Sequence, residues 1–317
     1  MTKQAIAPRP ISDTSANLKR SLPLFDLLQR ARPAARRRID EVRQLIWANL
    51  PVWQPPGRPH GLASELIVSV TSYPRRFRSL HYTLRSLLEQ DVQADRTILW
   101  IAERDRHCIP RSVWSLRDRG LEIRFSADVR SYKKLVPALE AFPDAFIVTA
   151  DDDIIYPQDW LGVLVAGYNP SDPSIVCRRA HRIGFDKEGF KPYLAWDLNL
   201  NDGSAFEPSH DLLAVGAGGV LYPPGALHAD VLRADMFMQL APQGDDLWFW
   251  WMGRRLGTKT RCAGEMKEYR YVAGTQAVAL WGENSIGGND RQLAALVSAF
   301  GYDQVKPGGP DGAPARP

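Results

Sequence analysis

One segment of this chain reads FIVTADDDIIYP and covers residues 146–157. Its first five residues form a short apolar run that is rich in β-branched side chains, which is typical of a buried strand. Three carboxylates, Asp151, Asp152 and Asp153, follow where that strand should end. Adjacent carboxylates repel one another and raise each other's pKa, so they favour a compensating cation. The segment therefore predicts a strand that carries an acidic cluster at its carboxyl end.

The spacing of these carboxylates suggests an ion site. Residues two apart on an extended chain point the same way, so Asp151 and Asp153 should converge on one ion while Asp152 faces elsewhere. Their oxygens are hard ligands that suit Mg²⁺ or Mn²⁺, and such ions suit a diphosphate. The alternative is a solvated acidic turn that caps a helix beginning near Pro157. Three aspartates directly after a buried strand favour the ion site.

Strands and helices alternate through the first half of the chain. The predicted elements are strand 66–70, helix 80–88, strand 97–101, helix 113–119, strand 121–125, helix 131–139 and strand 146–150. This alternation is typical of an α/β fold, with a mostly parallel sheet and helices on both faces. Ligands of such sheets bind outside the carboxyl ends of the strands. Residues 71–76 and 151–153 are both expected there.

The second half is less regular. A strand is expected at 175–178, and a loop-rich insert at 180–210. The segment 214–224 follows, in which Gly218 and Gly219 would let the backbone approach a ligand closely, although a tight turn has the same composition.

Two further acids, Asp245 and Asp246, begin a helix that carries three tryptophans. One explanation is capping of the helix, which needs only one acid. The other is a general base that faces the ion site. The aromatic run itself is more typical of a core than of a sugar-binding platform.

Composition limits the class of protein. The 317 residues are 44% hydrophobic and 24% charged, which is ordinary for a globular protein with a large core. The three cysteines are widely spaced, which argues against a disulfide framework or a zinc site and fits a reducing compartment. The first residues carry no apolar signal-peptide core, and no segment is long enough to span a bilayer. A cytoplasmic location is therefore expected.

The positive charge is concentrated at one end of the chain. Residues 1–50 hold ten Lys or Arg and four Asp or Glu, whereas the rest holds 30 and 32. Residues 34–50 predict an amphipathic helix with an arginine cluster at its start. This helix would bind an anionic membrane surface peripherally, at the inner face of the plasma membrane, or would pack on the body of the protein. Nucleic-acid binding is not supported, because the rest of the chain offers no basic stripe interleaved with aromatics.

Three parts follow from these patterns. Residues 1–59 are a basic helical extension with a proline-rich linker, residues 60–305 are the main domain, and residues 306–317 are a disordered tail. The glycine-rich loop at 281–290 is either a lid over a ligand or a polar turn that caps the next helix, predicted at 292–300.

Five motifs in this order resemble bacterial glycosyltransferases of the GT-A fold, close to family 2. The resemblance covers about residues 64–300. The motifs are Thr71-Ser-Tyr-Pro-Arg75, Ser131-Tyr-Lys-Lys134, Asp151-Asp-Asp153, Gly216-Ala-Gly-Gly-Val-Leu-Tyr-Pro-Pro224 and Asp245-Asp246. The resemblance implies transfer of a sugar from a nucleotide diphosphate donor, with Mn²⁺ or Mg²⁺ at the aspartate cluster. It also implies a glycan or lipid-linked acceptor in the synthesis of bacterial surface polysaccharides.

The resemblance also implies a role for each matched residue. Asp153 would be the main metal ligand, helped by Asp151, and Asp246 would deprotonate the acceptor, with Asp245 as the second candidate. The remaining matches would bind the nucleotide-sugar: Thr71, Tyr73, Arg75, Lys134, Asp151, Asp152, Gly218 and Gly219. A carboxylate opposite the leaving group would invert the anomeric carbon, and a UDP-sugar is the donor most frequent in the family.

One departure concerns the base of the nucleotide. The family usually has an aspartate-rich turn after its second strand, and here Glu103 or Asp105 would have to substitute. A third metal ligand stays open between His181, His210 and neither.

Three other classes compete with the transferase. A sugar nucleotidyltransferase should have a glycine-rich phosphate loop after the first strand, and Ser72-Tyr-Pro-Arg75 lacks glycine. A metal-dependent phosphohydrolase would place its Asp-x-Asp on the first strand. A non-catalytic subunit of a polysaccharide assembly complex could lose the acids, which are all present.

Overall fold

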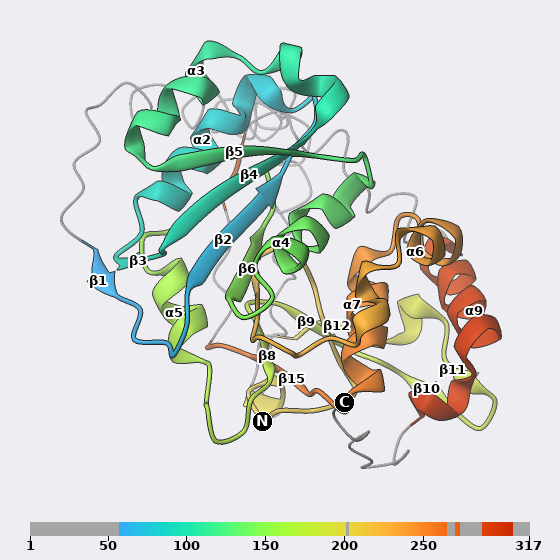
Figure 1. Ribbon diagram of the computed structural model, residues 1–317. Coiled ribbons are helices and arrows are strands. Elements are labelled where there is room, and N and C mark those ends of the chain that lie inside the picture. The colour runs from blue at the N-terminus through green and yellow to red at the C-terminus, as the bar shows by residue number, and fades with distance from the viewer. Residues whose placement is uncertain (1–56, 201–202, 265–269, 273–286, 307–317) are drawn as a thin grey trace, which may run out of the picture. The chain divides into compact units, whose positions relative to one another are not determined.

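The computed structural model describes residues 57–200, 203–264, 270–272 and 287–306 (Figure 1). The chain divides into two units, Met1–Leu50 and Pro51–Pro317, and the description concerns the second. The helix expected at 34–50, most of the loop at 281–290 and the tail from residue 307 onwards lie outside the described residues.

A seven-stranded sheet in the order β15-β8-β14-β6-β2-β4-β5 forms the centre of this unit (Figure 1). Its strands are β2 (Leu66–Thr71), β4 (Arg96–Ala102), β5 (Leu121–Ser126), β6 (Phe146–Ala150), β8 (Ile175–Cys177), β14 (Val220–Tyr222) and β15 (Thr260–Cys262). β14 runs antiparallel to both β6 and β8, and every other neighbouring pair is parallel. The expected α/β class with a mostly parallel sheet is confirmed, but the antiparallel strand inside the glycine-rich segment was not expected.

Helices cover both faces of this sheet. They are α2 (Phe77–Leu88), α3 (Arg111–Trp114), α4 (Val136–Ala141), α5 (Trp160–Ala166), α6 (Ala234–Leu240), α7 (Asp245–Arg255) and α9 (Asn289–Phe300). Short 3₁₀ helices are η2 (Glu103–Cys108), η3 (Ser115–Arg119), η4 (Arg130–Lys134), η5 (Tyr193–Ala195), η6 (Gly203–Ala205), η7 (Ala229–Leu232) and η10 (Tyr302–Gln304). The helices expected at 113–119 and 131–139 are each part α-helix and part 3₁₀ helix.

Side chains that alternate along β2 enter two separate cores. Leu66, Val68 and Val70 pack with residues of α2, α3 and α5, whereas Ile67 packs with residues of α4, α7 and α9. Burying one such side chain stabilises the fold by roughly 1.5–3 kcal/mol. In α7, Trp248 and Trp251 are fully buried. The aromatic run is therefore core, as the sequence favoured.

The insert at 180–210 is more ordered than expected. Strands β9 (Ala180–Arg182), β12 (Asp197–Leu200) and β13 (Leu212–Ala214) form a three-stranded antiparallel sheet. The remaining strands are too short to produce a periodic pattern in the sequence: β1 (Arg58–Pro59), β3 (Val92–Gln93), β7 (Ile154–Ile155), β10 (Phe185–Asp186), β11 (Gly189–Phe190) and β16 (Arg270–Tyr271).

Two further observations bear on the sequence analysis. The three cysteines are free thiols; Cys108 is exposed, whereas Cys177 and Cys262 are buried. In the part of the chain that the structure describes, no helix has both the length and the apolar character needed to cross a membrane.

Candidate active site

The acidic cluster lies at the carboxyl end of β6, as the sequence predicted. All five residues of β6 are buried, and the chain turns directly after Ala150. Because β2 and β6 are parallel neighbours, the segment that follows Thr71 lies at the same edge of the sheet. Residues 71–76 and 151–153 are therefore brought together.

Arg76 compensates two of the three carboxylates of the cluster. Its Nη1 atom lies 2.6 Å from Asp153 Oδ2 and 3.2 Å from Asp152 Oδ1, and its side chain is 8% exposed. The Ser72 hydroxyl donates a hydrogen bond of 2.5 Å to Asp152. The expectation that Asp152 faces away from Asp153 is therefore wrong, because the turn after β6 ends the alternation of an extended strand.

Burial controls the protonation of these two carboxyls. It raises the pKa of Asp152 to about 6, against the opposing effect of Arg76. Burial also raises the pKa of Asp153, and the negative charge of Asp151 adds to the shift. Asp151 and Asp153 are thus close enough to repel each other, and a bound cation would relieve that repulsion.

Lys134 joins the two acidic motifs. It ends η4, whose last carbonyl accepts a 2.6 Å hydrogen bond from Ser69 of β2. Its Nζ lies 2.9 Å from Asp245 Oδ2 and 3.4 Å from Asp151 Oδ1. Burial alone would lower the pKa of this ammonium, but the surrounding aspartates raise it well above its ordinary value. Lys134 therefore stays charged and ties the start of α7 to the end of β6.

Asp246 lies beside this bridge and is held by the backbone. The N–H of Gly216 donates to both of its carboxylate oxygens, at 3.1 Å each. Burial raises the pKa of Asp246 to about 7; the charge of Asp245 adds to the shift and Lys134 opposes it. A carboxylate with this pKa takes up a proton readily near neutral pH.

The glycine-rich turn needs its glycines for packing. A Cβ at Gly216 would lie 2.5 Å from Lys134 Nζ, and a Cβ at Gly219 would lie 2.5 Å from the Trp160 ring. Gly218 and Gly219 have φ values of 114° and 100°. The Trp160 indole also donates a 2.6 Å hydrogen bond to the Gly218 carbonyl. Contact of these two glycines with a ligand stays a prediction.

The predicted residues at the ends of β2 and β4 differ in how far they are exposed to solvent. Thr71 donates its hydroxyl to the Trp100 carbonyl, at 2.9 Å. Tyr73 is 37% exposed and Arg75 is exposed, so both side chains are accessible to a ligand. Glu103 and Asp105 lie in η2, which follows β4.

Each of the two histidines considered as metal ligands uses one ring nitrogen in a hydrogen bond within the fold. His181 Nδ1 accepts a 2.9 Å hydrogen bond from the Asn199 backbone, and His210 Nε2 lies 3.0 Å from the Gly257 carbonyl. Within the described ranges, no group of three or more His, Cys, Asp or Glu is placed to hold a metal ion. An ion bound here would rely on few protein ligands.

Three functional candidates were not singled out from the sequence: Arg76, Ser72 and Tyr193. The sequence shows two adjacent arginines before α2, and either could pair with the acidic cluster. The position at which the helix begins decides which of the two side chains points toward the cluster. Tyr193 belongs to the insert, and its pKa is raised by burial and by the charge of Asp246. Its backbone N–H donates to Asp290 at the start of α9. The insert thus forms part of the surroundings of Asp246.

No family model and no curated protein matches the sequence. Several solved structures are similar at low identity. One is the mannosyltransferase PcManGT from Pyrobaculum calidifontis in complex with GDP-Man and Mn²⁺, with 13% identity, a TM-score of 0.44 and coverage of 86% of this chain and 74% of that one.

Two other solved structures are similar to a comparable degree. S. aureus TarS 1–349 has 14% identity and a TM-score of 0.43, with coverage of 76% of this chain and 69% of that one. A 4-diphosphocytidyl-2C-methyl-D-erythritol synthase has 10% identity and a TM-score of 0.42, with coverage of 74% and 100%. At these values none of the similarities assigns an activity to this chain.

Proposed function

We propose that this protein is a glycosyltransferase that moves a sugar from a nucleotide diphosphate donor to an acceptor hydroxyl. One observation carries the proposal: Lys134 lies between Asp151 and Asp245, so that two acidic motifs far apart in the sequence share one site. If Asp245 only capped α7, it would not need an ion pair with a lysine that also contacts Asp151. Transfer from a diphosphate needs both a group that binds the donor and a base that serves the acceptor.

Asp246 is the proposed base. Its pKa of about 7 leaves a large fraction ionised at neutral pH while keeping enough basicity to accept a proton from a hydroxyl. The two hydrogen bonds from Gly216 fix the direction of the carboxylate. Asp245 is paired with Lys134, so its proposed role is to position the site rather than to accept the proton. Attack by a hydroxyl activated by Asp246, opposite the leaving diphosphate, would invert the anomeric carbon.

Asp151 and Asp153 fit a Mg²⁺ or Mn²⁺ ion. Their carboxylates repel each other, and a hard cation that keeps several waters needs only one or two protein carboxylates beside substrate phosphates. When bound, the ion would neutralise charge that develops on the leaving diphosphate. Arg76 holds Asp153 and Asp152 in place through its ion pairs.

The donor site is proposed to extend from this cluster along the end of β2. Tyr73 and Arg75 are accessible there, and Thr71 lies at the end of the strand. A UDP-sugar is the proposed donor, and the proposed acceptor is a glycan or lipid-linked sugar of the bacterial surface.

Calorimetric titration tests the donor site. UDP, GDP and their sugars are titrated into the wild type and Asp153→Ala, each with and without Mn²⁺. We expect one nucleotide to bind in a metal-dependent manner, and at least tenfold more weakly in the variant, since a metal ligand is lost. If no nucleotide binds the wild type in the presence of metal, the transferase proposal is wrong and a non-catalytic role is favoured.

Hydrolysis of the bound donor then tests the base. Asp246→Asn should bind the nucleotide normally but lose at least a hundredfold in turnover. Asp245→Asn should retain a much larger part of the activity. Equal losses in the two variants would contradict the assignment of Asp246.

A peripheral membrane contact through residues 34–50 is proposed from the sequence alone. Sedimentation with anionic vesicles tests it on the full chain and on a chain that lacks residues 1–50. Equal binding of the two chains would exclude this contact.

A further inference from the structure

β5 is the last strand of the central sheet. It pairs with β4 on one side, and within the described residues no strand pairs with its other side. An unpaired edge presents a row of N–H and C=O groups that readily accept another strand. Natural edges are usually protected by charged side chains, and β5 carries two, Glu122 and Arg124.

The order of residues on this edge is self-complementary. The sequence Leu121-Glu-Ile-Arg-Phe125 has a negative and a positive side chain placed symmetrically about Ile123. In an antiparallel pair with a twofold axis at Ile123, Glu122 of each copy faces Arg124 of the other. Leu121 faces Phe125 in the same way. Opposite charges directly across a strand pair stabilise it, and like charges destabilise it.

This complementarity selects one register. When two identical strands pair antiparallel, one hydrogen-bonded register changes into the next by a shift of the twofold axis along the strand by one residue. The adjacent registers put the axis at Glu122 or at Arg124, so that each would place like charges opposite each other. The pairing centred on Ile123 avoids both clashes.

The two charged side chains are accessible and held in place. Glu122 is 32% exposed and Arg124 is 34% exposed. Arg124 Nη2 lies 2.8 Å from Glu122 Oε2, and Arg96 Nη1 lies 2.6 Å from Glu122 Oε1. Little side-chain order would have to be gained on pairing.

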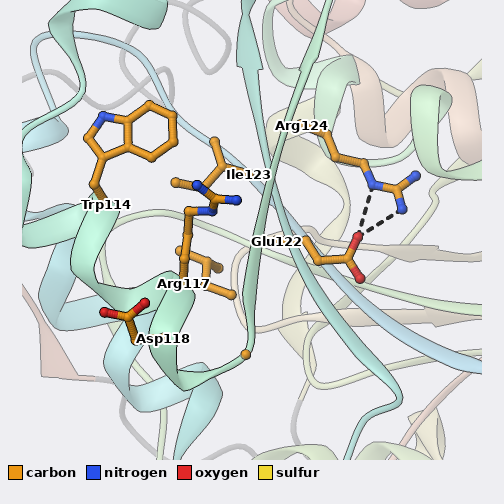
Figure 2. Close-up of a pocket in the computed structure, with 8 residues that line it drawn as sticks. Trp114, Arg117, Asp118, Glu122, Ile123 and Arg124 are labelled. Atoms are coloured by element: carbon orange, nitrogen blue, oxygen red, sulfur yellow. Dashed lines mark hydrogen bonds and ion pairs between the residues drawn. The ribbon is translucent and has the colours of Figure 1, made fainter.

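A hollow of about 750 Å³ runs along β5, and residues from both faces of the strand line it. Figure 2 shows Trp114, Arg117 and Ile123 on one side of the strand, and Glu122 and Arg124 on the other. Leu121 also lines the hollow. In the pairing described above, Phe125 of the second copy would lie across from Leu121 at the border of this hollow. The Arg117 guanidinium already lies 5.7 Å from the centre of the Trp114 ring, and a second aromatic ring beside this pair would extend the same kind of contact.

We propose that two copies of this chain pair through β5, antiparallel and with a twofold axis at Ile123, to form a continuous sheet across the dimer. A twofold interface of this kind uses the same surface on both subunits. β2 and β4 separate β5 from β6, which carries the acidic cluster. The proposal is independent of the proposed function.

Charge exchange is the first test. Light scattering coupled to size-exclusion chromatography gives the mass of the full chain, which should be that of a dimer. Glu122→Arg places like charges across both pairs and should weaken dimerisation roughly tenfold or more. The double variant Glu122→Arg with Arg124→Glu restores opposite charges and should restore the dimer. Circular dichroism and thermal melting check that each variant is folded.

Cross-linking gives a second test of the register. In a Cys108→Ser background, Ile123→Cys should form a disulfide-linked dimer under mild oxidation, because its Cβ lies about 5 Å from its symmetry mate. Ser126→Cys is the matched control, since the two copies of that residue would be about 20 Å apart. A monomer in solution at every concentration would overturn the proposal. A dimer that ignores Glu122→Arg and gives no cross-link at residue 123 would also overturn it.

Discussion

Replacing Asp246 by Asn should stabilise the protein, and more strongly at high pH than at low pH. In the folded protein, burial raises the pKa of this carboxyl from 3.8 to about 7. Between these two values the folded state keeps a proton that the unfolded chain has lost. The free energy of unfolding therefore falls as the pH rises through this window, and it stays level above the folded pKa.

The magnitude follows from the size of the shift. A change of about three pKa units corresponds to at most about 4 kcal/mol between the two ends of the window, at about 1.4 kcal/mol per unit. Between pH 5 and pH 8 the change is about 3 kcal/mol, because part of the window lies below pH 5. The amide side chain of the Asp246→Asn variant would carry no charge at either pH. It would also keep an oxygen to accept the Gly216 hydrogen bond.

Urea denaturation of the wild type and Asp246→Asn at pH 5 and pH 8 measures this effect. The gain in the free energy of unfolding should be larger at pH 8 by about 3 kcal/mol. Titration of Asp152 is common to both proteins and cancels in the comparison. Asp197→Asn, which removes an exposed carboxylate on β12, is the matched control for loss of charge. A gain that is equal at the two pH values would refute the raised pKa, and with it the electrostatic argument for the base.

Three further predictions concern other residues of the candidate active site. Arg76→Met should lower the free energy of unfolding by about 3 kcal/mol in the same denaturation assay, because it leaves Asp152 and Asp153 buried without the arginine that pairs with them. The control is Arg75→Met, which replaces an exposed arginine and should change the free energy of unfolding by less than about 0.5 kcal/mol. Gly216→Ala should lower donor turnover at least tenfold, since the new methyl group would displace Lys134. The control is Gly203→Ala, because a Cβ at residue 203 meets nothing within 4 Å. Equal turnover in the two variants would contradict the packing argument. Trp160→Phe should cost about 1 kcal/mol through the lost hydrogen bond to Gly218, measured by thermal melting; an unchanged melting temperature would show that this bond does not hold the turn.

Much of the fold could be predicted from the sequence because local patterns were strong. β2, β4 and β6 are mostly apolar segments of five or more residues, β5 alternates apolar and charged side chains, and α2 repeats leucine at helical spacing. The short antiparallel strand β14 could not be predicted, because three residues after a glycine cluster carry no period. Its direction depends on pairing with β6 and β8, which is a tertiary property.

The site was predictable to the level of motifs but not of contacts. The sequence indicated that the acidic cluster needed a cation, and it suggested a metal ion. It could not show that the buried Arg76 supplies one of the compensating charges, since this depends on where α2 begins. Nor could it show that Lys134 lies between the two acidic motifs, because their proximity arises only from the folded sheet.

The assembly of this site from distant segments has a consequence for folding kinetics. The contact between Arg76 and Asp152 closes a separation of 76 residues, and that between Gly216 and Asp246 closes one of 30. Contacts between distant residues require a loop-closure entropy before they are rewarded, so they tend to form later than local contacts. During refolding, recovery of activity should therefore lag behind the recovery of helical signal. Catalysis would then report on the last stage at which the chain becomes native.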